Sequence, residues 1–131
     1  MVLPHWLKGL TPIPDYRLTE IQRTHLELAW RIARDYPKVK NVQAAVLVHA
    51  DDRVVLAGIY IADTREFFIS PERLESARTT VDTTIHELGH HVSRADDGTS
   101  KHDESMREVA DQVRGRAAHG AYDQALARAI W

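Results

Sequence analysis

The segment Thr79–Val92 has the sequence TTVDTTIHELGHHV, and it carries the residues on which the interpretation of the whole chain depends. Its apolar residues Val81, Ile85, Leu88 and Val92 recur at the spacing of one helical face. A helix is therefore predicted here, and we expect its apolar face to pack against a sheet.

Within that predicted helix, His86-Glu87-Leu88-Gly89-His90 forms the pattern H-E-x-x-H. Residues at positions i and i+4 lie on the same face of a helix, so the two imidazole rings can reach one metal ion. A catalytic zinc site commonly has three protein ligands and a water molecule. The glutamate of the pattern is then placed to accept a proton from that water. We therefore predict that His86 and His90 bind zinc and that Glu87 is a general base.

The residues directly after the motif offer one candidate for the third ligand. Asp96 stands six residues after His90, a spacing at which some sites of this kind place a ligand, but Ser93 stands where those sites have a glycine. Asp96 and Asp97 also precede Gly98, and this composition is typical of a turn at the end of a helix. A turn is the preferred interpretation of both aspartates, and Asp96 stays open as a ligand.

Further candidates for the third ligand lie in a second predicted helix after the motif. Its apolar stripe, which includes Met106, is taken to face inward. Glu104 and Glu108 then project to the opposite side, whereas His102 and Asp103 flank the stripe. We rank His102 first and Asp103 second as the third ligand.

The composition is that of a globular domain with one hydrophobic core. The chain has 131 residues, of which 44% are hydrophobic and 27% charged. The net charge of -2 argues against a nucleic-acid partner, and no apolar run reaches the roughly 18 residues of a membrane span. The absence of cysteine excludes thiolate ligands and fits a cytoplasmic location.

The residues before the motif predict an arm followed by one compact unit. Two prolines near the N-terminus favour an extended arm over residues 1–17, and residues 18–131 are expected to form a single compact domain. Thr19 and Gln22 fit a capping box that begins a helix, and Pro37 ends that helix.

The remaining pattern predicts three strands and three further helices. The strands are expected at Val42–Val48, Val54–Ala62 and Phe67–Ser70. The further helices are a short one over Pro71–Ser76, a long one capped by Ser100, and a terminal one over Ala121–Ile130. The predicted fold class is α+β: a small antiparallel or mixed sheet of about three strands packed against a backing helix, the H-E-x-x-H helix and the following long helix.

At His86–His90 the chain resembles the zincin metallopeptidases, and its small size is most similar to the minigluzincins. The stretch Ile59–Gly98, which is under half of the chain, is similar to compact zincin-like domains annexed to bacterial and phage proteins. The resemblance implies zinc at the two histidines, Glu87 as general base, and an extended peptide added to Phe67–Ser70 or Val54–Ala62 at the sheet edge. The chain departs from gluzincins because its next helix has no glutamate at a clear inward position.

Several residues outside the ligand set have expected supporting roles. His91, Arg94, Tyr60 or Tyr122 can donate to an oxyanion that forms during peptide hydrolysis. His5, in the N-terminal arm, is interpreted as a tail residue, with an inhibitory contact to the metal as the alternative.

The expected function is a small metallopeptidase that uses Zn²⁺ to hydrolyse a peptide or protein substrate, with a partner domain or protein where the isolated domain is latent. The alternative is a zinc-stabilised module that binds a peptide or protein without turnover. Four protein ligands on the ion would favour this second function, because structural zinc sites are usually closed. A third hypothesis is a metal-free domain in which the H-E-x-x-H pattern is accidental.

Overall fold

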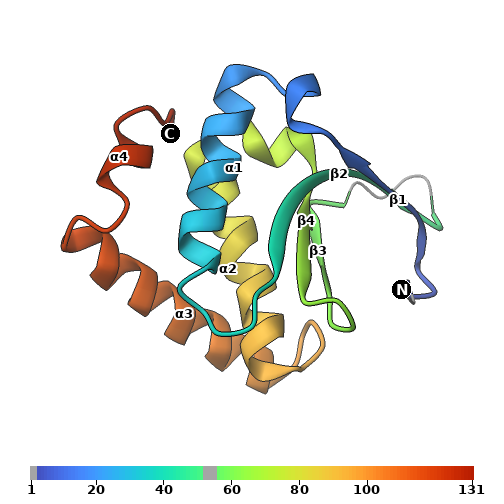
Figure 1. The fold of residues 1–131 in the computed structure, drawn as a ribbon. Coiled ribbons are helices and arrows are strands. Elements are labelled where there is room, and N and C mark those ends of the chain that lie inside the picture. The colour runs from blue at the N-terminus through green and yellow to red at the C-terminus, as the bar shows by residue number, and fades with distance from the viewer. Residues whose placement is uncertain (1–2, 52–55) are drawn as a thin grey trace.

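The computed structural model describes residues 3–51 and 56–131, which form an α+β fold (Figure 1). The sheet has four strands in the order β1-β2-β4-β3. The strands are β1 (Leu7–Ile13), β2 (Asn41–His49), β3 (Gly58–Ile61) and β4 (Glu66–Ile69). In this part of the chain, β1 and β3 are therefore the two edge strands.

The sheet is mixed, which is one of the two predicted arrangements. β1 pairs antiparallel with β2 and β3 antiparallel with β4, whereas β2 and β4 are parallel. The prediction of about three strands is wrong, because Leu7–Ile13 of the expected arm forms a fourth strand. Pro12 lies opposite Ala45 in this strand, and an edge strand tolerates proline because one side of its backbone has no partner strand.

The second predicted strand is only partly described. Of Val54–Ala62, the structure forms a strand at Gly58–Ile61, and Val54 and Val55 lie outside the described residues. The first and third predicted strands are confirmed with their ends shifted by one residue, as β2 and β4.

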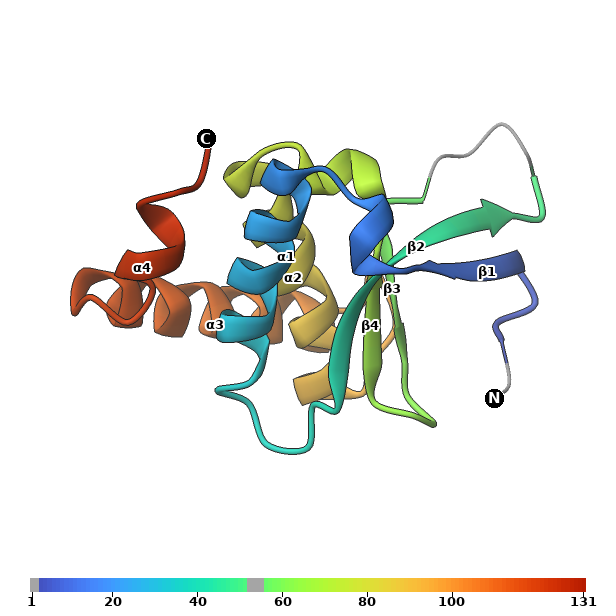
Figure 2. The same ribbon diagram turned by 45° about the horizontal axis from the view of Figure 1, so that its top comes forward.

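The helices lie on one side of the sheet, and β1 with the adjoining end of β2 extends away from them (Figure 2). The helices are α1 (Glu20–Ala33), α2 (Ala77–Ser93), α3 (Ser100–Ala118) and α4 (Asp123–Leu126), with 3-10 turns at Asp15–Arg17 and Pro71–Leu74. The motif helix, the backing helix and the long following helix are all confirmed.

The start of α1 is built as the sequence predicts. The Gln22 backbone N–H donates to Thr19 Oγ1 at 3.2 Å, and the Thr19 backbone N–H donates to Gln22 Oε1 at 2.8 Å. This reciprocal capping box satisfies two backbone donors that the helix itself leaves free. The helix ends at Ala33, ahead of Pro37.

The later helix ends differ from prediction. The cap of α3 is Thr99 rather than Ser100, because Thr99 Oγ1 accepts the backbone N–H of His102 at 3.2 Å. The terminal helix is a single turn, Asp123–Leu126, instead of Ala121–Ile130. Pro71–Leu74 forms a 3-10 turn, shorter than the predicted helix.

The hydrophobic core lies between the sheet and the helices. Neighbouring residues of β4 point to opposite faces: Phe67 packs with Leu28 and Leu88 on the helical side, and Phe68 packs with Ile59 on the other side. This alternation fixes the position of α2, whose Leu88 is completely buried within the H-E-x-x-H pattern.

Strand β3 approaches α2 closely because residue 58 is a glycine. A Cβ atom at Gly58 would lie 2.8 Å from Thr83 Cγ2 and 3.0 Å from the Phe68 carbonyl oxygen. Glu87 Cγ is 3.7 Å from the same point. The missing side chain thus lets an edge strand run directly beside the glutamate of the motif.

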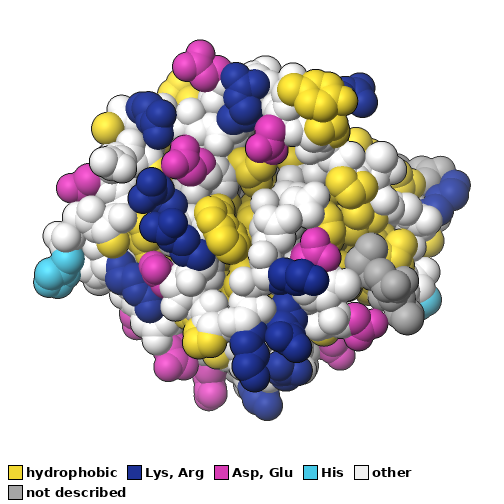
Figure 3. Space-filling view, viewed as in Figure 1, with side chains coloured by type: hydrophobic (Ala, Val, Ile, Leu, Met, Phe, Trp, Pro, Cys, Tyr) yellow, Lys and Arg dark blue, Asp and Glu magenta, His cyan; other side chains and the backbone are white. Residues whose placement is uncertain are grey.

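The surface carries both signs of charge. On the face that Figure 3 shows, Lys and Arg side chains are interspersed with Asp and Glu, in agreement with totals of 17 and 19 residues. Among the described residues, every helix is too short or too polar to cross a membrane.

Candidate metal centre

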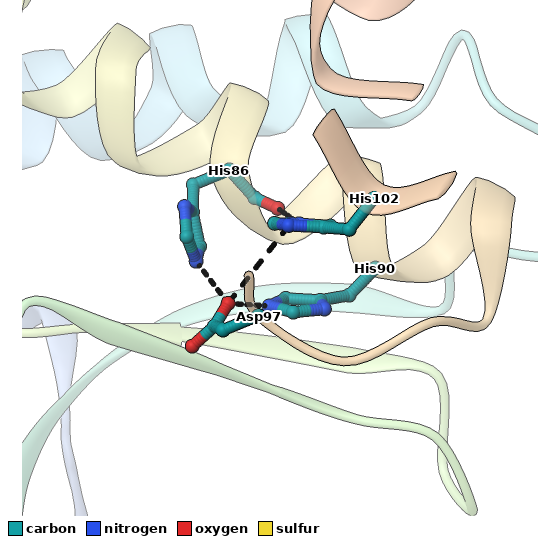
Figure 4. Close-up of side chains that lie close together, drawn as sticks. All are labelled: His86, His90, Asp97 and His102. Atoms are coloured by element: carbon teal, nitrogen blue, oxygen red, sulfur yellow. Dashed lines mark hydrogen bonds and ion pairs between the residues drawn. The ribbon is translucent and has the colours of Figure 1, made fainter. Parts of the chain in front are cut away.

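Four side chains from two helices and the turn between them meet at one point (Figure 4). His86 and His90 come from α2, His102 from the first turn of α3, and Asp97 from the connection. One ligand atom from each lies within 4.8 Å of all the others, so the group could hold a metal ion. The structure thus brings together three of the histidines singled out in the sequence.

The distances centre on one carboxylate oxygen. Asp97 Oδ1 lies 2.7 Å from His90 Nε2, 2.9 Å from His86 Nε2 and 3.9 Å from His102 Nδ1. Ligand atoms about 2.0 to 2.2 Å from a tetrahedral zinc are roughly 3.3 to 3.6 Å from one another. The observed separations lie on both sides of this range, so small side-chain shifts would fit the group around such an ion.

The three rings are packed against one another. The rings of His90 and His102 stack with centroids 3.9 Å apart and an angle of 12° between their planes. The His86 ring meets both at 76°, with centroids 5.0 Å from His90 and 4.9 Å from His102. This arrangement restricts ring rotation and directs one nitrogen of each ring toward the same point.

Backbone carbonyl groups fix two of the rings from behind. His90 Nδ1 lies 2.7 Å from the carbonyl oxygen of Ala95, and His102 Nε2 lies 3.1 Å from that of His86. A carbonyl can only accept, so each of these nitrogens carries the proton and donates. The opposite nitrogens, His90 Nε2 and His102 Nδ1, therefore present lone pairs, as in zinc sites whose histidines are held by a backbone carbonyl.

Electrostatics favour a cation in this position. Burial lowers the pKa of His86 below its usual value, so the ring is neutral at neutral pH. Partial burial raises the pKa of Asp97, but the His90 and His86 rings lower it by more, and the carboxyl group is ionised. Ring lone pairs and a carboxylate facing one another repel unless a proton or a metal ion lies between them.

Asp97 is the member of the group that sequence reasoning missed. The sequence predicts a turn residue, and Asp97 does lie in a turn, between Arg94 with a φ of 57° and Gly98 with a φ of 78°. These two left-handed residues reverse the chain after α2 and bring Asp97 back over the rings. Aspartates before a glycine are common in ordinary turns, so the sequence offers no signal that separates Asp97 from Asp96.

The acidic residues considered as third ligands lie outside the group. Asp103, Asp96, Glu104 and Glu108 are exposed, and none belongs to the group of four. His102, in contrast, is 1% exposed. The structure therefore brings His102 to the candidate site and leaves Asp103 in solvent.

Glu87 is buried between α2 and β3. Glu87 is 5% exposed. Burial raises the pKa of its carboxyl group to about 8, and the charge of Asp97 also raises this pKa. The backbone of Tyr60 in β3 lowers the pKa through a hydrogen bond, but by less. A divalent cation nearby would reverse this balance and favour the ionised form.

His91 joins α2 to the sheet rather than to the ligand group. Its Nδ1 lies 2.7 Å from the Tyr60 hydroxyl and its Nε2 lies 2.7 Å from the Pro37 carbonyl oxygen. The carbonyl requires a proton on Nε2, so the Tyr60 hydroxyl donates to Nδ1. The hydroxyl of Tyr122, another candidate oxyanion donor, instead donates to Asp35 at 3.1 Å.

Arg94 and His5 are exposed residues that supply no atom to the group of four. Arg94 is the left-handed cap that ends α2, and its side chain is exposed. His5 is exposed and is not part of the group of four.

The glycine of the motif lets α3 approach α2. A Cβ atom at Gly89 would lie 2.7 Å from Met106 Cγ and 3.0 Å from His102 Nε2. We predict that Gly89→Ala displaces α3, costs about 1 to 3 kcal/mol of unfolding free energy and weakens metal binding. Urea unfolding and a competition titration with a chelator measure the two effects.

Gly115 provides the matched control for that substitution. It lies in α3, and a Cβ atom there would meet nothing within 4 Å. Gly115→Ala is expected to stabilise the helix by roughly 0.5 to 1 kcal/mol and to leave metal affinity unchanged. If the Gly89→Ala protein and the parent bound the metal with equal affinity, the close approach of α3 to α2 would not be needed for metal binding.

Comparisons with known proteins identify no relative of this chain. No protein-family model matches the chain, and searches of curated proteins and of solved structures give no match. The functional argument therefore rests on His86, His90, His102, Asp97 and the buried Glu87.

Proposed function

We propose that this protein is a zinc-dependent peptidase of the zincin type. The single observation that carries the proposal is the convergence of His86, His90 and His102, with two of the rings fixed by backbone carbonyl groups. Three imidazoles with one further position are a common ligand set for catalytic zinc. The absence of cysteine leaves nitrogen and oxygen donors, which zinc also accepts.

The histidine ligands and Glu87 would have separate roles in peptide hydrolysis. Zinc held by the three histidines would polarise the peptide carbonyl and lower the pKa of a water molecule to about 7. Glu87 would take the proton from the attacking water and give it to the leaving amine. Glu87 follows His86 directly in α2 and is 5% exposed, so bulk water has little access to its carboxyl group.

The edge strand β3 supports a peptide as the substrate. β3 is at the end of the sheet order, and the backbone of its Tyr60 reaches Glu87. An extended peptide can pair with an unpaired strand edge through main-chain hydrogen bonds. Of the two strands that the resemblance suggests for this role, β4 is interior and β3 is the edge, so we assign the substrate to β3.

A second candidate function is a zinc-stabilised binding module without turnover. One observation favours it: Asp97 supplies a fourth protein ligand atom within the group. A site closed by four protein ligands is typical of zinc that stabilises a fold. Both functions require zinc at the three histidines, and they differ in the role of Asp97 and in turnover.

The experiment that tests the proposal is cleavage of a diverse peptide library by the zinc-loaded protein. We expect cleavage that stops on chelation and returns with added zinc. The His102→Ala protein should show neither tight zinc binding nor cleavage, while His119→Ala, which alters an exposed histidine at the end of α3, should resemble the parent. Stoichiometric zinc without cleavage of any peptide would favour the binding module instead.

A further inference from the structure

Asp97 differs from the three histidines in how it is held. Its side chain is 72% exposed, compared with 40% for His86, 19% for His90 and 1% for His102. Moving the carboxylate out of the group would place it in water, where an ionised group is well solvated. Removing His102 would instead leave a cavity beside the His90 ring, on which the His102 ring stacks. Asp97 is therefore the ligand that can leave at the lowest cost.

The turn around Asp97 stays in place without the Asp97 side chain. The Ala95 carbonyl accepts from His90 Nδ1 at 2.7 Å, and the Ala95 backbone N–H donates to Ser93 Oγ at 3.0 Å. On the far side, Thr99 Oγ1 donates to the Asp96 carbonyl at 2.8 Å. These bonds anchor the backbone on both sides, so a rotation of one side chain is enough to move the carboxylate.

The carboxylate lies where an incoming oxygen would bind. Its Oδ1 is within 4 Å of a ring nitrogen from each of the three histidines. In a site with three protein ligands, this fourth position is the one that water or a substrate carbonyl takes. Asp97 and a substrate oxygen therefore compete for the same place.

We propose that Asp97 is a detachable fourth ligand that keeps the metal centre latent until an incoming oxygen or anionic ligand displaces it. This inference rests on the proposed zinc function and adds its regulation. It also joins the two candidate functions: the centre is closed when Asp97 is bound, as in a structural site, and open when Asp97 has left, as in a catalytic site.

The test uses the full chain loaded with Co²⁺ in place of zinc, and azide as the probe of an open position. The visible spectrum of Co²⁺ depends on its ligands and their geometry, so a change on azide addition reports access to the metal without any substrate. The three proteins compared are the parent, Asp97→Ala, and Asp96→Ala, which removes the neighbouring exposed aspartate that lies outside the group.

We expect Asp97→Ala to bind azide at least about tenfold more tightly than the parent, and Asp96→Ala to behave like the parent. Metal affinity of the Asp97→Ala protein should fall by about 100-fold or less, the range for partners that support a site without forming its core. Identical azide responses in parent and Asp97→Ala would overturn the proposal, and so would loss of metal from Asp97→Ala alone.

The outcome also separates this inference from the proposed function. Azide binding that is weaker in the parent than in Asp97→Ala, without peptide cleavage by either protein, would support the detachable ligand and contradict the peptidase. Azide binding that appears only in Asp97→Ala would show that Asp97 does not detach and would overturn the inference. A parent protein that binds neither zinc nor cobalt would contradict both.

Discussion

We expect that replacing Glu87 by Gln lowers the rate of peptide cleavage by about 10²- to 10⁴-fold while the protein keeps its zinc. Glutamine has nearly the same shape as a protonated glutamic acid but cannot accept the proton of the attacking water. Glu87 is buried with a pKa raised to about 8 in the metal-free protein, so the neutral amide fits the same surroundings. Single-turnover cleavage and zinc content are the two measurements.

A second carboxylate, on the next helix, provides the control for Glu87→Gln. Glu104 is an exposed carboxylate of α3, and Glu104→Gln is expected to leave cleavage and zinc content unchanged. The comparison is made in the parent and in the Asp97→Ala background, where the fourth position is open. Cleavage that persists at the parental rate in Glu87→Gln would show that another group is the base.

We expect zinc at a free concentration of about 1,000 times its Kd to stabilise the folded protein by roughly 4 kcal/mol, because the unfolded chain lacks a preformed site. For a chain of this length that free energy corresponds to a rise in Tm of about 10 to 20 °C. The reason lies in the tertiary structure: His102 comes from a different helix than His86 and His90, so a bound ion would join α2 to α3. Calorimetry with and without a chelator measures the shift.

Variants separate this metal effect from packing. His102→Ala destabilises the metal-free protein as well, since its ring is buried against His90. The informative quantity is therefore the difference in Tm with and without zinc within each variant. That difference should vanish in His102→Ala and persist in His119→Ala. A zinc-dependent shift of parental size in His102→Ala would mean that the ion binds elsewhere.

Local patterns predict the elements that carry the site. The periodicity around Leu88 indicates α2, and the capping box of Thr19 and Gln22 indicates the start of α1. The helical wheel of α3 places both His102 and Asp103 beside the apolar stripe, and the structure buries His102 and leaves Asp103 exposed. These features depend on residues three or four positions apart, which a single sequence displays.

Features that depend on pairing between residues far apart in the sequence cannot be predicted from such local patterns. Two prolines argue against a strand in the segment that forms β1. The strand is nevertheless possible because Pro12 lies in an edge strand. The parallel pairing of β2 with β4 inserts β4 between β2 and β3, and no local pattern encodes that order. Asp97 reaches the rings through the left-handed backbone of Arg94 and Gly98, so its direction follows from backbone geometry rather than periodicity.

Gly89 shows a signal that could have been used. A glycine inside a helix costs about 1 kcal/mol relative to alanine, so its presence within α2, ahead of the last turn, calls for a reason. The structure supplies it, because His102 and Met106 occupy the space that a side chain would need. A helical glycine next to candidate ligands therefore indicates where a second helix, with a further ligand, comes close.

The most direct test of the zinc centre is a crystal structure of the zinc-loaded protein with anomalous diffraction data at the zinc edge. We predict one strong anomalous peak about 2.0 to 2.2 Å from His86 Nε2, His90 Nε2 and His102 Nδ1. A peak bound by other residues, or zinc-loaded crystals in which these three nitrogens point away from one another, would contradict it.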